Sequence, residues 1–311
     1  MKLERVKCKP LDRAKNLCVS RSYIVGCTGK KAVIIDKQLN HIHTVEGLEY
    51  VYSAEVSPDE TKLLLISNGN KFYIVDMNTF EKTRITVKAP YNHNLEGRGC
   101  WSFDSKSVWI PVQRSTDYIN STLRCYCVQD FSKYEDYLAD KYYLNGISKI
   151  EANNTYFLTG YNRQESNRTY FLYFDGSEFR EYPLEASGNM IAPTVTINME
   201  KGVITVAAIT GCQQFTLDGK AVKTISCPDT EDQEMGVPDA LDDITKAEMS
   251  SCGSYRYLAA QNGFYLLDAN TGDILASVPE EYGVQNFAEL NPGLLAIATW
   301  TGVKLYSFCN S

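Results

Sequence analysis

The apolar and β-branched positions of this chain fall in short runs that recur along almost its whole length. The clearest set lies between Tyr50 and Val87, where turn residues separate four runs. These runs are 50–56, 62–67, 71–75 and 81–87. Short runs of Val, Ile, Leu, Tyr and Phe bounded by Pro, Asn, Asp and Gly are typical of β-strands. We therefore predict four antiparallel strands, A to D, joined by short turns.

The same unit can be placed at other positions along the chain. Further copies cover 23–45, 101–128, 147–184, 194–226, 244–278 and 285–307. An Asp-containing turn follows strand C in most copies, for example at Asp36, Asp76 and Asp268. A four-stranded unit that repeats every 40–54 residues or so is typical of β-propeller blades. The pattern predicts an all-β fold, a seven-bladed β-propeller of four-stranded antiparallel blades that forms one domain over residues 1–311.

Two copies are incomplete at the chain ends. The first begins at strand B, and the last ends after strand C. A separate run from Leu3 to Cys8 (LERVKC) has no partner in sequence. We predict that this N-terminal strand is the outer strand of the last blade, because closure leaves no blade incomplete.

Three turns carry a family resemblance. Residues 57–60 (SPDE) and 101–106 (WSFDSK) resemble the FSPDG turn between strands A and B of WD40-like propellers. Residues 268–273 (DANTGD) are similar to the D-x-x-T-G turn of WD40-like and quinoprotein-like repeats. The Gly-His and Trp-Asp dipeptides of the WD40 repeat are absent, so the resemblance concerns the superfold. It implies a platform for partner binding, although propellers also include lactonases, quinoprotein dehydrogenases and glycosidases.

The predicted loops differ between the two faces. The A–B turns are all short, whereas five long connections belong to the face that carries the B–C and D–A loops. These connections are 88–98, 113–122, 162–168, 185–192 and 227–243. Insertions in repeat proteins collect on the binding face, although tolerated surface insertions would give the same pattern. We predict that this face, in blades three to six, binds a partner.

Tyr and Arg side chains are frequent in these connections, and both are common anchors of protein interfaces. His93 accompanies them. The predicted partner-binding residues are Tyr91, Arg98, Arg114, Tyr118, Tyr161, Arg163, Arg168 and Trp300. Some of these tyrosines would instead pack under their own loops, because the chain contains 21 Tyr.

Polar residues of strand A are expected to line a central channel. The candidates are Glu55, Lys149, Glu248 and Glu289. Paired carboxylates can act as general acid and base or as nucleophile, but they more often only face channel water. An enzyme of the lactonase or glycosidase kind, or a sensor of a small molecule or ion, is therefore the alternative to a binding module. We predict no catalytic residue, because no nucleophile accompanies His93 and no phosphate loop, CxxC pair or HExxH motif occurs.

Charge, hydrophobicity and cysteine distribution limit which kinds of molecule the protein is expected to bind. The formal net charge is −7, and no dense Lys/Arg run occurs, which argues against nucleic acid and anionic membrane as partners. No apolar stretch is long enough to span a bilayer, and residues 1–13 lack the apolar core of a signal peptide. The ten Cys are scattered, mostly in strand-like runs, as expected of reduced thiols in the cytoplasm. We expect a monomeric cytoplasmic protein with a protein or peptide partner.

The connection from Cys227 to Asp243 is acidic, with seven acids and no Lys or Arg. A solvated loop explains this composition, while a lure for a basic partner or a weak Ca²⁺ site are alternatives. Its spacing does not match an EF-hand loop, so we predict no metal and no cofactor.

Overall fold

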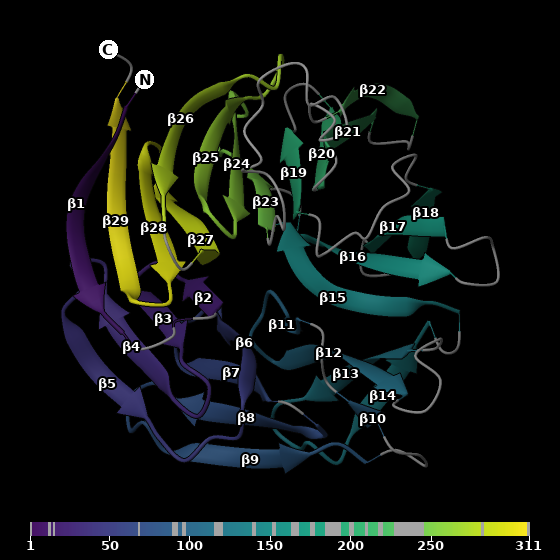
Figure 1. Cartoon of the computed structure of the whole chain (residues 1–311). Helices are drawn as coiled ribbons and strands as arrows, with labels where there is room; N and C mark the ends of the chain where they lie inside the picture. Colours follow the sequence, from purple (N-terminus) through teal and green to yellow (C-terminus); the bar gives the residue numbers. More distant parts are fainter. Residues whose placement is uncertain are drawn as a thin grey trace. The chain divides into compact units, whose positions relative to one another are not determined.

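The structure is a computed structural model of the chain. It describes residues 2–11, 14, 16–67, 69–88, 93–94, 98–114, 121–138, 141–150, 154–162, 168–174, 178–183, 194–198, 202–208, 211–216, 220–226, 246–280 and 283–309. These residues form seven antiparallel sheets, and the fold is an all-β seven-bladed β-propeller (Figure 1). The chain divides into two compact units, which we call the four-blade unit (Asn16–Leu184) and the three-blade unit (Met1–Lys15 with Glu185–Ser311).

The four-blade unit contains blades one to four. Blade one consists of β2 (Asn16–Val19), β3 (Tyr23–Cys27), β4 (Ala32–Asp36) and β5 (His41–Val45). Blade two consists of β6 (Val51–Val56), β7 (Lys62–Ser67), β8 (Lys71–Asp76) and β9 (Lys82–Thr86). Blade three consists of β10 (His93–Asn94), β11 (Cys100–Trp101), β12 (Ser107–Arg114), β13 (Ser121–Cys127) and β14 (Tyr134–Tyr137). Blade four consists of β15 (Tyr143–Ile150), β16 (Thr155–Asn162), β17 (Arg168–Phe174) and β18 (Phe179–Pro183).

The three-blade unit contains blades five to seven. Blade five consists of β19 (Thr194–Asn198), β20 (Val203–Ala208), β21 (Gly211–Thr216) and β22 (Ala221–Ser226). Blade six consists of β23 (Lys246–Met249), β24 (Tyr255–Ala260), β25 (Gly263–Asp268) and β26 (Ile274–Pro279). Blade seven consists of β27 (Val284–Asn291), β28 (Leu294–Thr299), β29 (Gly302–Cys309) and β1 (Lys2–Pro10).

The middle strands of a blade are apolar on both faces because each face packs on a different neighbour. In β7, Leu63 and Leu65 belong to a core shared with blade one. Leu64 and Ile66, which alternate with them, belong to a core shared with blade three. A strand that is buried on both sides reads as a continuous hydrophobic run. The outer strand β9 is mostly exposed, which explains its polar sequence.

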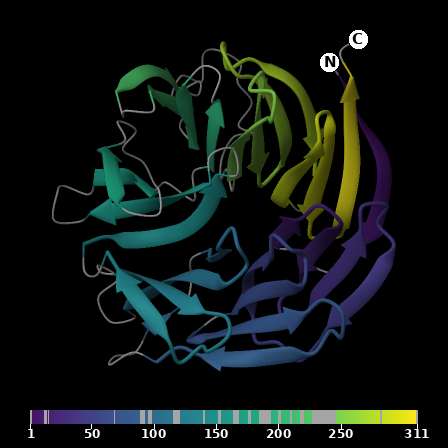
Figure 2. The same cartoon turned by 180° about the vertical axis from the view of Figure 1, so that it is seen from behind.

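The N-terminal strand completes blade seven, as predicted. β1 pairs antiparallel with β29 from Lys2 opposite Cys309 to Pro10 opposite Gly302, and the two strands lie side by side in both views (Figures 1 and 2). A Cβ atom on Gly302 would lie 2.3 Å from the carbonyl oxygen of Lys9, so only glycine permits this close approach. Leu3 packs against the core between blades six and seven.

Three strands were not predicted, and the two-residue strand β10 is one of them, because residues 88–98 were expected to form a connection. β2 supplies strand A of blade one, so that blade is complete, contrary to the expectation that it starts at strand B. β2 is only four residues long, and the polar residues around it hide its pattern. β14 supplies strand D of blade three, but its sequence YEDY is mostly exposed and polar. An outer strand buries little, so hydrophobic periodicity cannot reveal it.

The inner strand of blade three is shorter than predicted, with two residues in place of the expected 101–103. Gly99 precedes it at a crowded position, where a Cβ atom would lie 2.6 Å from Cδ1 of Ile66 and 2.7 Å from the carbonyl oxygen of Trp109. At Arg98 the chain instead forms a parallel bridge with Gly146 of blade four.

The thiols fit the prediction of buried, unpaired cysteines in part. Cys18, Cys27 and Cys100 are buried and free, whereas Cys8 and Cys252 are exposed. Burial and the nearby Glu55 carboxylate raise the pKa of Cys18 to about 12, so its thiol is unreactive at neutral pH.

Candidate functional site

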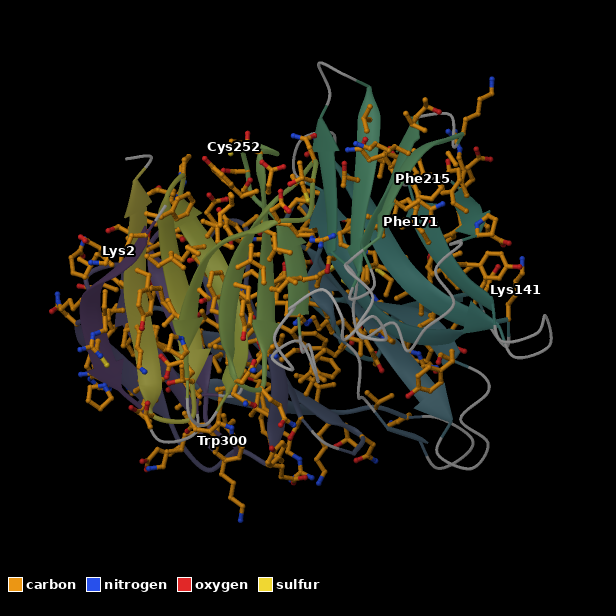
Figure 3. The ribbon with its side chains drawn as sticks, turned by 45° about the horizontal axis from the view of Figure 1, so that its top comes forward. Lys2, Lys141, Phe171, Phe215, Cys252 and Trp300 are labelled. Atoms are coloured by element: carbon orange, nitrogen blue, oxygen red, sulfur yellow. The ribbon has the colours of Figure 1, made fainter. Side chains whose placement is uncertain are left out.

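Each blade has two different ends. We call the end with the A–B and C–D turns the turn end, and the end with the B–C hairpin and the D–A connection the loop end. Within the three-blade unit, Cys252 lies at a turn end and Trp300 at a loop end, at opposite ends of the strands (Figure 3). The two ends are built from different chemistry.

The turn ends of blades two and three share one hydrogen-bonded motif. Ser57 Oγ donates to Asp59 Oδ1 at 2.6 Å and accepts from the Lys62 N–H at 2.9 Å. Asp59 Oδ1 also accepts from the Thr61 N–H at 3.1 Å. Ser102 and Asp104 make the same contacts one blade later. Partial burial works to raise the pKa of Asp59, but hydrogen bonds from Ser57 and Thr61 hold it below its usual value, so this turn favours the charged carboxylate.

Blade six places a thiol where blades two and three have an Asp. Ser250 Oγ lies 3.3 Å from Cys252 Sγ, and the Tyr255 N–H donates to Ser250 Oγ at 3.0 Å. Partial burial works to raise the pKa of Cys252, but hydrogen bonds from Ser250 and from the Ser254 N–H and hydroxyl lower it. The thiol therefore occupies the position that the Asp carboxylate has in blades two and three, and either Ser250 Oγ or Cys252 Sγ is the donor in their contact.

Glu60 connects the turn ends of blades one and two. Its Oε1 accepts from Ser20 Oγ and from the Ser22 N–H, both at 2.7 Å, and its Oε2 accepts from Ser22 Oγ at 2.6 Å. Glu60 has a φ of 57°, a left-handed conformation that a non-glycine residue adopts only at a cost. The equivalent A–B turn position is glycine at Gly253. The cost at Glu60 is offset by the hydrogen bonds that its side chain makes to the neighbouring blade.

Phe80, in the C–D turn of blade two, likewise has a left-handed backbone and a side chain that contacts blade one. Its φ is 59°, and its ring stacks on His43 of blade one with centroids 4.2 Å apart and planes 9° apart. Blades one and two are thus joined at their turn ends by two side chains on strained backbone. Neither residue was selected from the sequence, since strain at a turn is not visible without φ angles.

The predicted channel residues of the four-blade unit contact each other across blade three. Lys149 Nζ lies 2.7 Å from Glu55 Oε1, and both side chains are mostly buried. Glu55 also accepts from Trp101, whose backbone N–H lies 3.2 Å from Oε2 and whose Nε1 lies 2.9 Å from the Glu55 carbonyl oxygen. Inner strands of three successive blades therefore meet at this carboxylate.

In the three-blade unit, each predicted carboxylate also has a local partner. Lys246 Nζ lies 2.8 Å from Glu248 Oε2 and donates to the Phe287 carbonyl oxygen at 2.6 Å. Glu289 accepts from the Tyr257 hydroxyl at 2.9 Å and from the Ser251 N–H at 2.7 Å. Burial and the Glu289 carboxylate raise the pKa of Tyr257, so its hydroxyl remains a donor. These contacts favour a structural role for both carboxylates.

The loop ends of blades three and four bring together several of the predicted binding positions. Arg114 is the last residue of β12 and lies opposite His93 of β10. Tyr161 lies opposite Tyr143 of β15, and Arg168, the first residue of β17, lies opposite Asn162. Arg114 and Arg168 were predicted in loops, but the strands extend to include them. These positions are therefore fixed on the sheet framework.

Main-chain contacts join these two loop ends. The Ile147 N–H donates to the Arg98 carbonyl oxygen at 2.8 Å, and the Ser121 N–H donates to the Tyr142 carbonyl oxygen at 2.8 Å. Buried Tyr142 packs on Tyr170 with ring centroids 5.6 Å apart. Arg98 was predicted as the last residue of a loop, but it bridges the inner strands of two blades.

The remaining predicted site residues are located as follows. Tyr91, Tyr118 and Arg163 lie outside the described residues, as does the acidic connection from Cys227 to Asp243. Trp300 is half-buried in the hairpin between β28 and β29, at the loop end of blade seven (Figure 3).

Arg124 is a buried cation that the sequence did not single out. Its guanidinium makes a two-pronged contact with Asp136, with Nε–Oδ1 at 2.6 Å and Nη2–Oδ2 at 2.8 Å, and it lies 3.9 Å from the Tyr134 ring centroid. Partial burial works against the charge, but the Asp136 contact raises the pKa of the guanidinium. Arg124 attaches β14 to its blade, which explains how so polar a strand is held.

Among the residues that the structure describes, no group of three or more His, Cys, Asp and Glu side chains could hold a metal ion. In the same residues, no helix has the length and apolarity needed to cross a membrane.

A scan against protein-family models finds no match for this chain, and a search of curated proteins finds no relative. The chain is therefore assigned at the level of the seven-bladed β-propeller fold.

Proposed function

We propose that the protein is a WD40-like interaction module that binds a protein or peptide partner on the loop-end face, at blades three and four. The observation that carries this proposal is the strand register of blades three and four. It sets His93 opposite Arg114, and Tyr143 opposite Tyr161, at one end of two adjacent blades. Arg and Tyr side chains on a rigid framework are the usual anchors of a protein interface.

The proposal includes a monomeric protein in the cytoplasm. A net charge of −7 favours solubility, and buried free thiols such as Cys18 and Cys100 suit a reducing compartment. The partners of Glu55 and Glu289 support a binding module over a hydrolase, because both carboxylates already accept protein donors.

The proposal is tested by affinity capture from the native cell lysate. Wild type is compared with an Arg114→Ala, Tyr118→Ala, Arg163→Ala variant at the loop ends. A matched control removes three exposed cations from turn ends, as Arg21→Ala, Lys106→Ala, Lys133→Ala. We expect the loop-end variant to lose a protein that wild type and the control both retain. Equal capture by all three proteins would contradict the assignment of the binding face.

A further inference from the structure

We propose that β1 (Lys2–Pro10) is a second interaction surface, which binds an extended acidic peptide as an added β-strand. β1 is the outer strand of blade seven, and within the described part of the chain β29 is the one strand that pairs with it (Figure 1). In an antiparallel ladder, half of the backbone N–H and C=O groups of an outer strand point away from its partner. Such an edge is a template to which an extended peptide can add by main-chain hydrogen bonds.

The first observation is the length of this edge. β1 has nine residues, whereas the outer strands of the other six blades, as the structure describes them, have four to six. Proteins usually keep an edge strand short or cover it, because a long open edge attracts other strands. At about 3.3 Å per residue, β1 offers an edge of about 30 Å, enough for a typical strand of five or six residues.

The second observation is the exposure of β1. Five successive residues, Glu4 to Cys8, are exposed, and Val6 is 60% exposed. Successive residues of a strand point to opposite faces, so both faces of β1 are open to solvent over this stretch. In the outer strand β9, by contrast, Ile85 is buried, and three of the six residues of β26 are only partly exposed. An incoming strand would therefore meet few steric obstacles along β1.

The third observation is the charge of β1, which decides the kind of peptide. Four of its nine residues are Lys or Arg and one is Glu, a formal charge of +3 in a chain that carries −7. Glu4 lies 3.5 Å from Lys2, but both side chains are largely exposed, and such a pair contributes little. The other six outer strands carry between −2 and +2. Opposite charges on neighbouring strands stabilise their pairing, so this edge favours a strand rich in Glu or Asp.

The same features disfavour a second copy of the chain as the added strand. The register of β1 on β29 shifts between Arg5 and Lys7, which makes Val6 the extra residue of a β-bulge. Bulges and edge lysines are the devices by which natural edge strands avoid pairing with their own copies. Two β1 strands side by side would also bring two charges of +3 together. An acidic strand meets no such repulsion.

The test measures binding of labelled ten-residue probes to the full-length chain by fluorescence anisotropy. The acidic strand probe alternates Glu and Thr, and the comparison probes alternate Gln and Thr, or Lys and Thr. A further probe alternates Glu and Pro, which keeps the negative charge but removes every second backbone donor. Oligouridylate is the nucleic-acid probe. We expect the Glu-Thr probe to bind at least about ten-fold more tightly than the Glu-Pro probe, because several main-chain hydrogen bonds are lost with Pro.

Variants of β1 locate the contact. The change Lys2→Gln, Arg5→Gln, Lys7→Gln should weaken the Glu-Thr probe by about two- to five-fold for each site. The charge-preserving change Lys2→Arg, Arg5→Lys, Lys7→Arg should bind as wild type does. A matched control, Lys133→Gln, Lys220→Gln, Lys223→Gln, removes three exposed cations elsewhere and should also bind as wild type does. Thermal unfolding of each variant excludes a loss of fold as the cause.

Amide hydrogen exchange tests the added strand directly. Bound Glu-Thr probe should slow exchange in residues 2–10 and leave exchange in residues 220–226 unchanged. The proposal is wrong if the Glu-Pro probe binds as tightly as the Glu-Thr probe, or if the neutral, basic or nucleic-acid probe binds best. It is also wrong if the chain forms a dimer that the Gln variant of β1 abolishes, because the edge would then hold a second copy. Loss of Glu-Thr binding in the loop-end variant described above would place the contact at the loop ends and overturn the assignment to β1.

Discussion

The turn ends and the loop ends of the blades differ in what their side chains do. At the turn ends, side chains hold adjacent blades together: Glu60 bonds to Ser20 and Ser22, and Phe80 stacks on His43. Among the described residues at the loop ends of blades three and four, main-chain hydrogen bonds from Ile147 to Arg98 and from Ser121 to Tyr142 join adjacent blades. Where a side chain holds two blades together, substitution of that residue costs stability. Where only backbone groups join the blades, the side chain can be substituted without losing the contact, so it can be adapted to bind a partner. The end of the blade at which a residue lies therefore indicates, better than its residue type, whether it is a candidate for a structural role or for partner binding.

The largest expected effect comes from β1, which runs the full length of β29 and so serves both ends of blade seven. Deletion of Met1–Pro10 removes one strand of that blade and exposes the edge of β29. We expect the free energy of unfolding to fall by about 5 kcal/mol or more, comparable to the stability of a typical domain, measured by chemical denaturation.

A point variant provides the control for this deletion. Gly302→Ala places a Cβ atom 2.3 Å from Lys9 and should cost about 1–3 kcal/mol, as expected of overpacking. Gly253→Ala also adds a methyl group at positive φ, but into open space, and should cost less. A truncated protein that unfolds at the wild-type temperature would show that β1 is dispensable.

The second effect tests the structural role of the turn ends. Glu60→Ala keeps the strained backbone but removes the hydrogen bonds to Ser20 and Ser22, so we expect a loss of about 1.5–3 kcal/mol. Glu60→Gly relieves the left-handed strain and should still destabilise if the side chain is what matters. Glu81→Ala, at an exposed position in the C–D turn of the same blade, is the control and should change stability by less than about 0.5 kcal/mol.

This contact also predicts a pH dependence. Partial burial opposes the charge of Glu60, but hydrogen bonds from Ser22 and Ser20 lower its pKa below 4.5. A carboxylate whose pKa is lower in the folded state stabilises the fold above its unfolded pKa, and that stability is lost as the pH falls through the folded value. Wild type should therefore lose stability below about pH 4.5 more steeply than Glu60→Gln. Parallel acid-unfolding curves would show that Glu60 makes no such contribution.

The third prediction compares the stability that one side chain contributes in the A–B turns of blades two, three and six. Asp59→Ala and Asp104→Ala each remove a charged acceptor and should cost about 1–2 kcal/mol. Cys252→Ala removes an uncharged, weaker hydrogen-bonding group from the same position of blade six and should cost about half as much. Thermal unfolding of the three variants measures this directly, and an equal cost at all three sites would mean that the thiol is held as firmly as the carboxylates.

The smallest effect on stability is expected at the loop ends. Arg114→Ala and Arg168→Ala change side chains at the last and first residues of β12 and β17, and each should alter the free energy of unfolding by less than about 0.5 kcal/mol. Partner capture should nevertheless be lost. A large loss of stability would assign these side chains a structural role and remove the contrast between the two ends.

The sequence by itself determined the fold class, because strands buried on both faces leave continuous apolar runs, as in β7 and β8, and the turns between them recur. It also determined that Leu3 to Cys8 closes the last blade, since an unpaired strand and an incomplete blade complement each other. It did not reveal β2, β10 or β14, which are short or polar and leave little periodic signal.

Only the tertiary structure decided which polar residues join blades. Glu55 and Lys149 are far apart in sequence, and their 2.7 Å ion pair depends on how successive inner strands converge. Glu60 resembles any exposed turn residue until its φ and its contacts with the next blade are known. Local patterns follow from the burial of each strand, whereas contacts between blades depend on the packing of segments that sequence order does not bring together.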